Sequence, residues 1–252
     1  MKTLRLPFAA LLLLGVAACN KGNVSFNGSA NTTTNATDQA ASLVTAALSE
    51  NTNGAFNTFS DVSIETQAHV SIDSLCGTTW TDSITRKTSA TPSGVSYNYS
   101  AKYTYTLNCD SVTKKGIYNG SSTATSEYSG SYTGPNLSST NSGSSMVVIQ
   151  GLGRGSSYYT INGEYKQSGS YTSKTDTGTN SVNITLTNVE LTKPFQFVKS
   201  GTATISVSGM SSKNGSFSYS GVLVFNSGNS ATLTLNGTVY IINLVNGTSK
   251  RQ

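Results

Sequence analysis

The single histidine of the chain, His69, would have to serve any Ser-His-Asp triad or histidine-metal site. The nearest acidic residues in the sequence are Glu65 and Asp73, each four positions away. If this segment is an extended strand, four residues span about 13 Å, so the three side chains cannot touch one another. None of the 41 serines lies in a nucleophile-elbow sequence. We therefore expect His69 to be an exposed strand residue, and we assign no catalytic residue.

The other groups that could do chemistry are spread singly along the chain. The six Asp and five Glu residues form no close pair of the kind that hydrolyses glycosides, although folding could bring two of them together. The glycine-rich segment 151–155 precedes no helix pattern that could bind a phosphate at its N-terminus, so it is read as a turn. Two internal cysteines without a histidine partner offer no zinc site. We expect no metal and no cofactor.

Cys76 and Cys109 are the two internal cysteines, and each ends a segment in which apolar and polar residues alternate. By that alternation both fall on the apolar face, which favours a buried disulfide in an exported protein over two separate thiols. The bridge requires Cα atoms about 4.4 to 6.8 Å apart. Residues 77–94 must then turn the chain back between the two strands.

The first 18 residues are typical of an export signal, because two positive charges, Lys2 and Arg5, precede a short apolar stretch. That stretch is shorter than the roughly 20 residues that a membrane-spanning helix needs. The signal ends in Val16-Ala17-Ala18-Cys19, which resembles the bacterial lipobox. The resemblance implies cleavage before Cys19 and acylation of its side chain. Two or three acyl chains, palmitate among them, would anchor the protein in a membrane of the bacterial envelope, the outer membrane being the expected one.

Three Asp-Ser-apolar tripeptides resemble the sites at which exported proteins of Bacteroidota are O-glycosylated. Their serines are Ser74, Ser83 and Ser111. The resemblance makes these serines candidate modification sites.

The composition favours an all-β protein. Ser, Thr, Asn and Gly make up 124 of the 252 residues, about half, and only 11% of residues are charged. Residues 95–109 alternate strictly between apolar and polar side chains, and residues 62–76 alternate at most positions, which predicts two long strands with one wet face each. Further strands are predicted at 202–208, 216–225, 231–235 and 238–245, and repeated Asn-Gly pairs predict tight hairpins between antiparallel neighbours. The predicted architecture is a sandwich or an open curved sheet, and a transmembrane barrel is the structural alternative.

The rest of the mature chain divides into three segments. Residues 19–36 are polar and are expected to be a flexible tether. Residues 37–54 are predicted to form one short helix and a connection, and 55–252 an all-β domain. A loop or hinge is expected at 129–145, where Ser, Gly and Asn dominate.

The tyrosines at positions 97, 99, 103 and 105 lie on one face of a predicted strand. They could stack against sugar rings, but we expect them to form the core, because the opposite face is wholly polar. The lipobox, the polar tether and the strands rich in Ser, Thr, Asn and Tyr together resemble small Bacteroidota-type lipoproteins of uncharacterised function. That resemblance implies a location and a β architecture, and no activity.

We therefore expect a non-catalytic, membrane-anchored envelope lipoprotein with a binding or structural role toward a glycan, an envelope polymer or a protein partner. The alternatives are a hydrolase that uses His69 or a carboxylate pair, and a lipid carrier with a large apolar cavity. Removal of residues 1–18 leaves a net charge of 14 − 11 = +3, with basic residues scattered singly, so no nucleic-acid partner is expected.

Overall fold

The computed structural model describes residues 30–70, 76–89, 94–109, 118–153, 155–193 and 197–252, with side chains from residue 36 onward apart from 118 and 119. Within these described residues, two α-helices and a short 3₁₀ helix precede eleven strands. The helices are α1 (Ala30–Leu48), η1 (Glu50–Thr52) and α2 (Ala55–His69). The strands are β1 (Thr79–Thr88), β2 (Ser96–Cys109), β3 (Tyr118–Thr133), β4 (Leu137–Gln150), β5 (Tyr158–Ser173), β6 (Thr177–Thr192), β7 (Val198–Ser211), β8 (Gly215–Asn226), β9 (Ser230–Leu235), β10 (Thr238–Asn243) and β11 (Thr248–Arg251).

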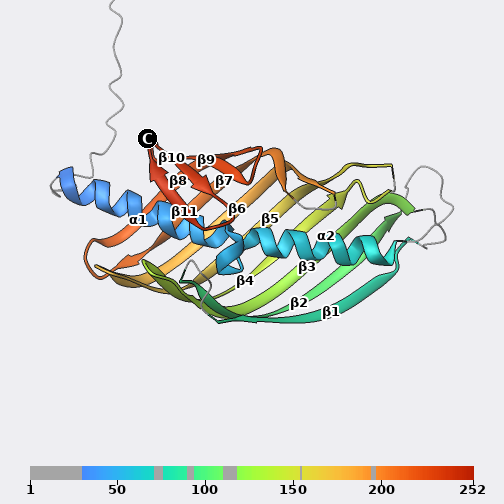
Figure 1. The fold of residues 1–252 in the computed structure, drawn as a ribbon, viewed down its shortest axis with the longest axis horizontal. Coiled ribbons are helices and arrows are strands. Elements are labelled where there is room, and N and C mark those ends of the chain that lie inside the picture. The colour runs from blue at the N-terminus through green and yellow to red at the C-terminus, as the bar shows by residue number, and fades with distance from the viewer. Residues whose placement is uncertain (1–29, 71–75, 90–93, 110–117, 154, 194–196) are drawn as a thin grey trace, which may run out of the picture.

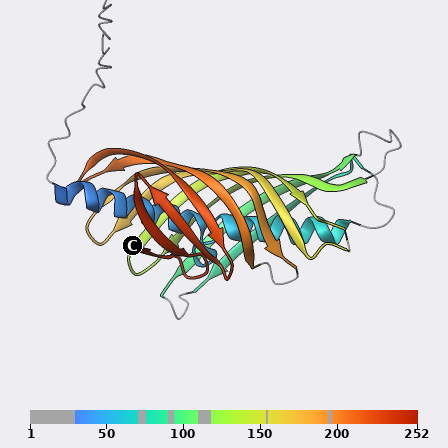
Figure 2. The same cartoon turned by 90° about the horizontal axis from the view of Figure 1, so that it is seen from above.

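All eleven strands form one antiparallel sheet whose spatial order is the chain order, β1 to β11. The sheet is open and strongly curved, and it arches over the two helices (Figures 1 and 2). The prediction of an all-β fold built from antiparallel hairpins is therefore confirmed, with the open curved sheet rather than the sandwich.

Side chains alternate along each long strand between the concave and the convex face of the sheet. In β2 the buried positions are Tyr99, Tyr103, Tyr105 and Leu107, while Tyr97 is partly buried against the same core. The prediction that these tyrosines form the core is confirmed. The convex positions of the sheet carry mostly Ser and Thr, whose hydroxyl groups can hydrogen-bond to water.

Glycines on the concave face let the sheet curve tightly. The ring of Tyr99 lies over Gly130 on the neighbouring strand, where an added Cβ atom would come within 2.3 Å of the ring. Tyr128 covers Gly143 in the same way, at 2.3 Å from its hydroxyl. A large ring thus fills the space that a missing side chain leaves on the next strand.

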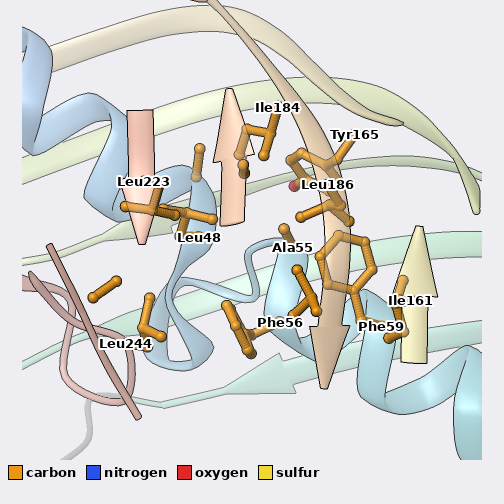
Figure 3. Packing of buried hydrophobic residues seen from close by; sticks show 14 of the residues in the cluster. Leu48, Ala55, Phe56, Phe59, Ile161, Tyr165, Ile184, Leu186, Leu223 and Leu244 are labelled. Carbon is orange, nitrogen blue, oxygen red and sulfur yellow. The ribbon is translucent and has the colours of Figure 1, made fainter. Parts of the chain in front are cut away.

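The helices fill the concave side of the sheet. Phe59 of α2 packs edge-on against Tyr165 of β5, and Phe56 packs against Phe225 of β8, with ring centroids 6.1 and 5.6 Å apart. Leu48 at the end of α1 is fully buried in the same cluster (Figure 3). The helices and the sheet therefore form one core. Burial of each such side chain contributes about 1.5 to 3 kcal/mol to stability.

Contacts between the first helices and the last strands complete the fold. The Tyr240 hydroxyl of β10 donates to Asp38 of α1 at 2.7 Å, across 202 residues of sequence. The backbone N–H of Glu50 donates to the carbonyl of Leu244 at 2.8 Å. The two ends of the described chain therefore lie together.

Some sequence-based predictions are wrong. Residues 62–69 of the predicted strand 62–76 lie in α2, because Phe56, Phe59 and Thr66 belong to a buried face with helical spacing that begins before the alternating stretch. The domain 55–252 therefore starts with a helix. Residues 71–75 lie outside the described residues. The segment 129–145, expected as a hinge, lies within β3 and β4 and their tight turn at 134–136. Helix α1 begins at Ala30, inside the range expected to be a tether.

Candidate functional site

A group of chemically versatile side chains lies where the end of α2 meets β1 and β2. The hydroxyl of Tyr105 donates to the carboxylate of Asp82 and lies 3.4 Å from Nδ1 of His69. The rings of His69 and Trp80 have centroids 5.2 Å apart, and Trp80 stacks on Tyr105. Burial, followed by the hydrogen bond to Asp82 and then the charges of Asp82 and Glu65, raises the pKa of Tyr105 well above its usual range. Tyr105 therefore stays protonated and holds the Asp82 carboxylate.

This geometry corrects the expectation for His69. The residue ends helix α2 instead of lying on a strand, so Glu65 is one helical turn away and its carbonyl oxygen lies 2.8 Å from Nδ1 of His69. The separation of about 13 Å expected for extended chain does not apply. Asp73, the other acidic neighbour, lies outside the described residues.

A second polar group lies about two turns earlier on α2, at Asp61. Asp61 is buried, forms an ion pair with Arg86 of β1, and accepts a hydrogen bond from the Tyr103 hydroxyl at 3.2 Å. Burial raises the pKa of Asp61, and the nearby Arg86 only partly offsets this effect. Because the Asp61 side chain is 7% exposed and covered by its partners, it lies inside the contact between α2 and β1.

The predicted disulfide is present between Cys76 and Cys109, with Cα atoms 4.7 Å apart. The bridge joins the chain between α2 and β1 to the end of β2. The expectation that the bridge is buried is wrong, because Cys109 is exposed and Cys76 is half-exposed. The register of β2 against β3 shifts between Leu107 and Cys109, so the parity of the strand does not carry through to the cysteine.

Asp176 anchors the tip of the β5–β6 hairpin to the β7–β8 hairpin. Its carboxylate accepts hydrogen bonds from Tyr171, Ser211, Ser212 and the backbone N–H of Lys213, at 2.9, 2.7, 2.9 and 3.2 Å. Burial alone would raise the pKa of Asp176, but these four donors lower it below its ordinary value. All four bonds lie within the fold, so this group stabilises structure.

The convex face carries a feature that appears only when the strands are placed in register. One serine from each of seven consecutive strands occupies the same cross-strand row, and Thr85 of β1 extends the row by one strand. We call this set the serine row: Ser100, Ser129, Ser142, Ser168, Ser181, Ser208 and Ser218. All but Ser181, which is half-buried, are exposed. With strands about 4.8 Å apart, the seven serines span about 29 Å.

Two adjoining depressions of about 470 and 490 Å³ open on the convex face, and both contain Ser142 and Ser168 of the serine row. Most of the residues that line both depressions are Ser, Thr, Asn or Gln. Glu127 and Lys166 contribute one negative and one positive charge to the first of them. This arrangement can donate and accept many hydrogen bonds without favouring an ion of either sign.

The candidate modification sites are placed only in part. Ser83 is exposed on β1, whereas Ser74, Ser111 and the expected lipidation site Cys19 lie outside the described residues. The part of the chain that the structure describes contains no group of three or more His, Cys, Asp or Glu residues able to hold a metal ion. Within the same residues, no helix combines the length and hydropathy needed to cross a membrane.

The fold and the convex face define an all-β protein, an open antiparallel sheet wrapped around its own N-terminal helices. No family model, curated protein or solved structure matches the chain.

Proposed function

We propose that this protein is a non-catalytic lipoprotein, anchored in the bacterial envelope through Cys19, that binds an extended glycan polymer along the serine row. The row carries the proposal, because it repeats one hydroxyl about every 4.8 Å across seven strands. An extended β-linked polysaccharide advances by a similar length for each sugar. Neutral hydroxyl and amide groups suit such a ligand, and the two depressions at Ser142 and Ser168 give it a place to lie.

The concave face supports this choice of surface. A lipid carrier would need its apolar cavity there, but Leu48, Phe56 and Phe59 of the helices fill that space. The tyrosines that could have stacked on sugars are buried in the same core. The convex face is therefore the surface that remains for a large polar ligand.

A cosedimentation assay with insoluble chitin and with purified peptidoglycan sacculi tests glycan binding. The variant pair Ser142→Phe and Ser168→Phe places two rings across the depressions and should weaken binding about tenfold, which corresponds to about 1.4 kcal/mol. The matched control is Thr185→Phe with Thr204→Phe, another exposed cross-strand pair on the same face. Equal binding by both double variants, or no binding by the unmodified protein to either polymer, would contradict glycan binding along this row.

Metabolic labelling with palmitate tests the anchor separately. Label should be incorporated into the unmodified protein and lost in Cys19→Ala, which should also leave the membrane fraction. An unlabelled unmodified protein would end the lipoprotein proposal without affecting the glycan proposal.

One observation favours a hydrolase as the second candidate. The Asp82 carboxylate of β1 accepts a hydrogen bond from Tyr105, and the negative charge of Glu65 on α2 also contributes to the raised pKa of Tyr105. Release of reducing ends from a glycan, abolished by Asp82→Asn, would support catalysis. Binding without release is the result expected from our proposal.

A further inference from the structure

The first strand of the sheet, β1, has one edge that pairs with β2 and one edge that faces away from the sheet. Before β1 begins, the N–H of Leu107 donates to the carbonyl of Thr78 at 3.1 Å. Backbone direction alternates along an antiparallel strand, so the even-numbered residues of β1 bond to β2 and the odd-numbered residues direct N–H and C=O outward. These outward residues are Thr79, Thr81, Ser83, Thr85 and Lys87. No hydrogen bond recorded among the described residues uses their outward backbone groups.

An edge of this kind is a template for another strand. None of the ten residues of β1 is buried, and none is a proline that would block pairing. The opposite edge of the sheet, β11, has only four residues. β1 is therefore the edge long enough for a stable strand pairing.

We propose that β1 pairs antiparallel with β1 of a second copy of this chain, about a two-fold axis that passes beside Ile84. In this register Ile84 faces Ile84 of the second copy, and Asp82 faces Arg86 of the second copy. Both pairs lie on the concave side, because even-numbered residues of β1 are the half-buried ones. Directly opposed side chains have Cβ atoms about 4.5 to 5.5 Å apart, within reach of an ion pair.

The charges select this register over its neighbours. A shift of the axis to Asp82 would set Asp82 against itself, and a shift to Arg86 would set two arginines against each other, each a repulsive arrangement. Shifts of the axis to residue 83 or 85 oppose Ile84 to Asp82 or to Arg86. Only the axis at Ile84 joins the apolar side chains to each other and the opposite charges to each other. Arg86 can contribute because its side chain is 37% exposed while it holds Asp61.

A cysteine substituted on the proposed axis tests the register directly. Opposed residues that are not hydrogen-bonded to each other have Cα atoms about 4.5 Å apart, which a disulfide can bridge. Ile84→Cys should therefore cross-link two full-length chains in intact cells, giving a band of twice the monomer mass on a non-reducing gel. The matched control is Thr88→Cys, on the same face. In the proposed dimer the two Thr88 positions are eight strand residues apart, a distance of about 26 Å. Monomeric Ile84→Cys, or equal cross-linking of both variants, would overturn the proposal.

A proline substitution tests the edge itself. Ser83→Pro removes an outward N–H and leaves the β1–β2 ladder intact, so the purified protein should change from dimer to monomer in multi-angle light scattering while its circular dichroism is unchanged. A folded Ser83→Pro protein that stays dimeric would overturn the proposal, and if this variant does not fold, the cysteine pair decides. Neither measurement depends on glycan binding, whose test residues lie on β4 and β5.

Discussion

Replacement of Asp176 by Asn should destabilise the fold at neutral pH. The carboxylate is 7% exposed and accepts four hydrogen bonds, two at each oxygen. An amide keeps one acceptor oxygen and turns an NH₂ group toward the other two donors. Hydrogen bonds to a charged group contribute about 1.5 to 3 kcal/mol each, so the loss of two bonds predicts a decrease of about 3 kcal/mol in the free energy of unfolding.

Thermal and urea denaturation followed by circular dichroism measure this effect. For a domain of this size about 3 kcal/mol corresponds to a decrease in Tm of roughly 6 to 12 °C. The matched control is Glu127→Gln, an exposed acid on the convex face, which should stay within about 0.5 kcal/mol of the unmodified protein. If Asp176→Asn is as stable as this control at pH 7, the assignment of Asp176 as a structural anchor is refuted.

The pH dependence gives an independent check on Asp176. Because the folded-state pKa lies below the ordinary value of 3.8, the carboxylate stabilises the fold fully above that pH and loses this contribution as the pH falls through the folded pKa. The stability difference between the unmodified protein and Asp176→Asn should be constant from about pH 5 to 8 and shrink below about pH 3.8. A difference that persists undiminished in acid would contradict the electrostatic origin.

Three further perturbations have defined outcomes. Gly143→Ala places a Cβ atom 2.0 Å from a backbone oxygen and should cost about 1 to 3 kcal/mol in urea denaturation, whereas Gly153→Ala, with nothing within 4 Å, should be neutral. The raised pKa of Asp61 favours its neutral form in the fold, so Asp61→Asn should match the unmodified protein near about pH 3.5 and be the more stable of the two at pH 7; equal stability at both pH values would contradict the burial effect. The disulfide closes a loop of 33 residues, so joint replacement of Cys76 and Cys109 by Ser should lower the free energy of unfolding by roughly 3.5 to 4 kcal/mol. The β signal in circular dichroism should remain.

The strands that sequence patterns predicted are those whose concave residues are apolar. In β2 the alternation of Tyr, Ala and Leu with polar residues shows one face to be buried, and β7 to β10 give the same signal. In β4 to β6 the concave positions include Asn141, Gly169 and Asn180, so the alternation is lost and these strands were not predicted. The concave side of such strands is filled by neighbouring rings, which a single segment does not reveal.

The candidate site was even less predictable. A serine is unremarkable at any one of 41 positions, and the serine row exists only because six successive registers align its members. Register depends on pairing between strands and on the bulges that shift it, neither of which is encoded locally. The helical segment containing His69 was misread for a different reason: β-branched residues at alternate positions imitated a strand where Phe56 and Phe59 set a helical face.

The chain order of the strands has a consequence for how the protein is made. Synthesis from the N-terminus delivers α1 and α2 first, so their apolar sides emerge before any strand exists to cover them. Each later hairpin can pair with the one just delivered, because every strand neighbours its predecessor, and the sheet can grow around the helices one hairpin at a time. The bond between Tyr240 and Asp38 cannot form until nearly the whole chain is present. Throughout that interval part of the apolar surface of the helices stays uncovered, which is the condition under which folding chains aggregate.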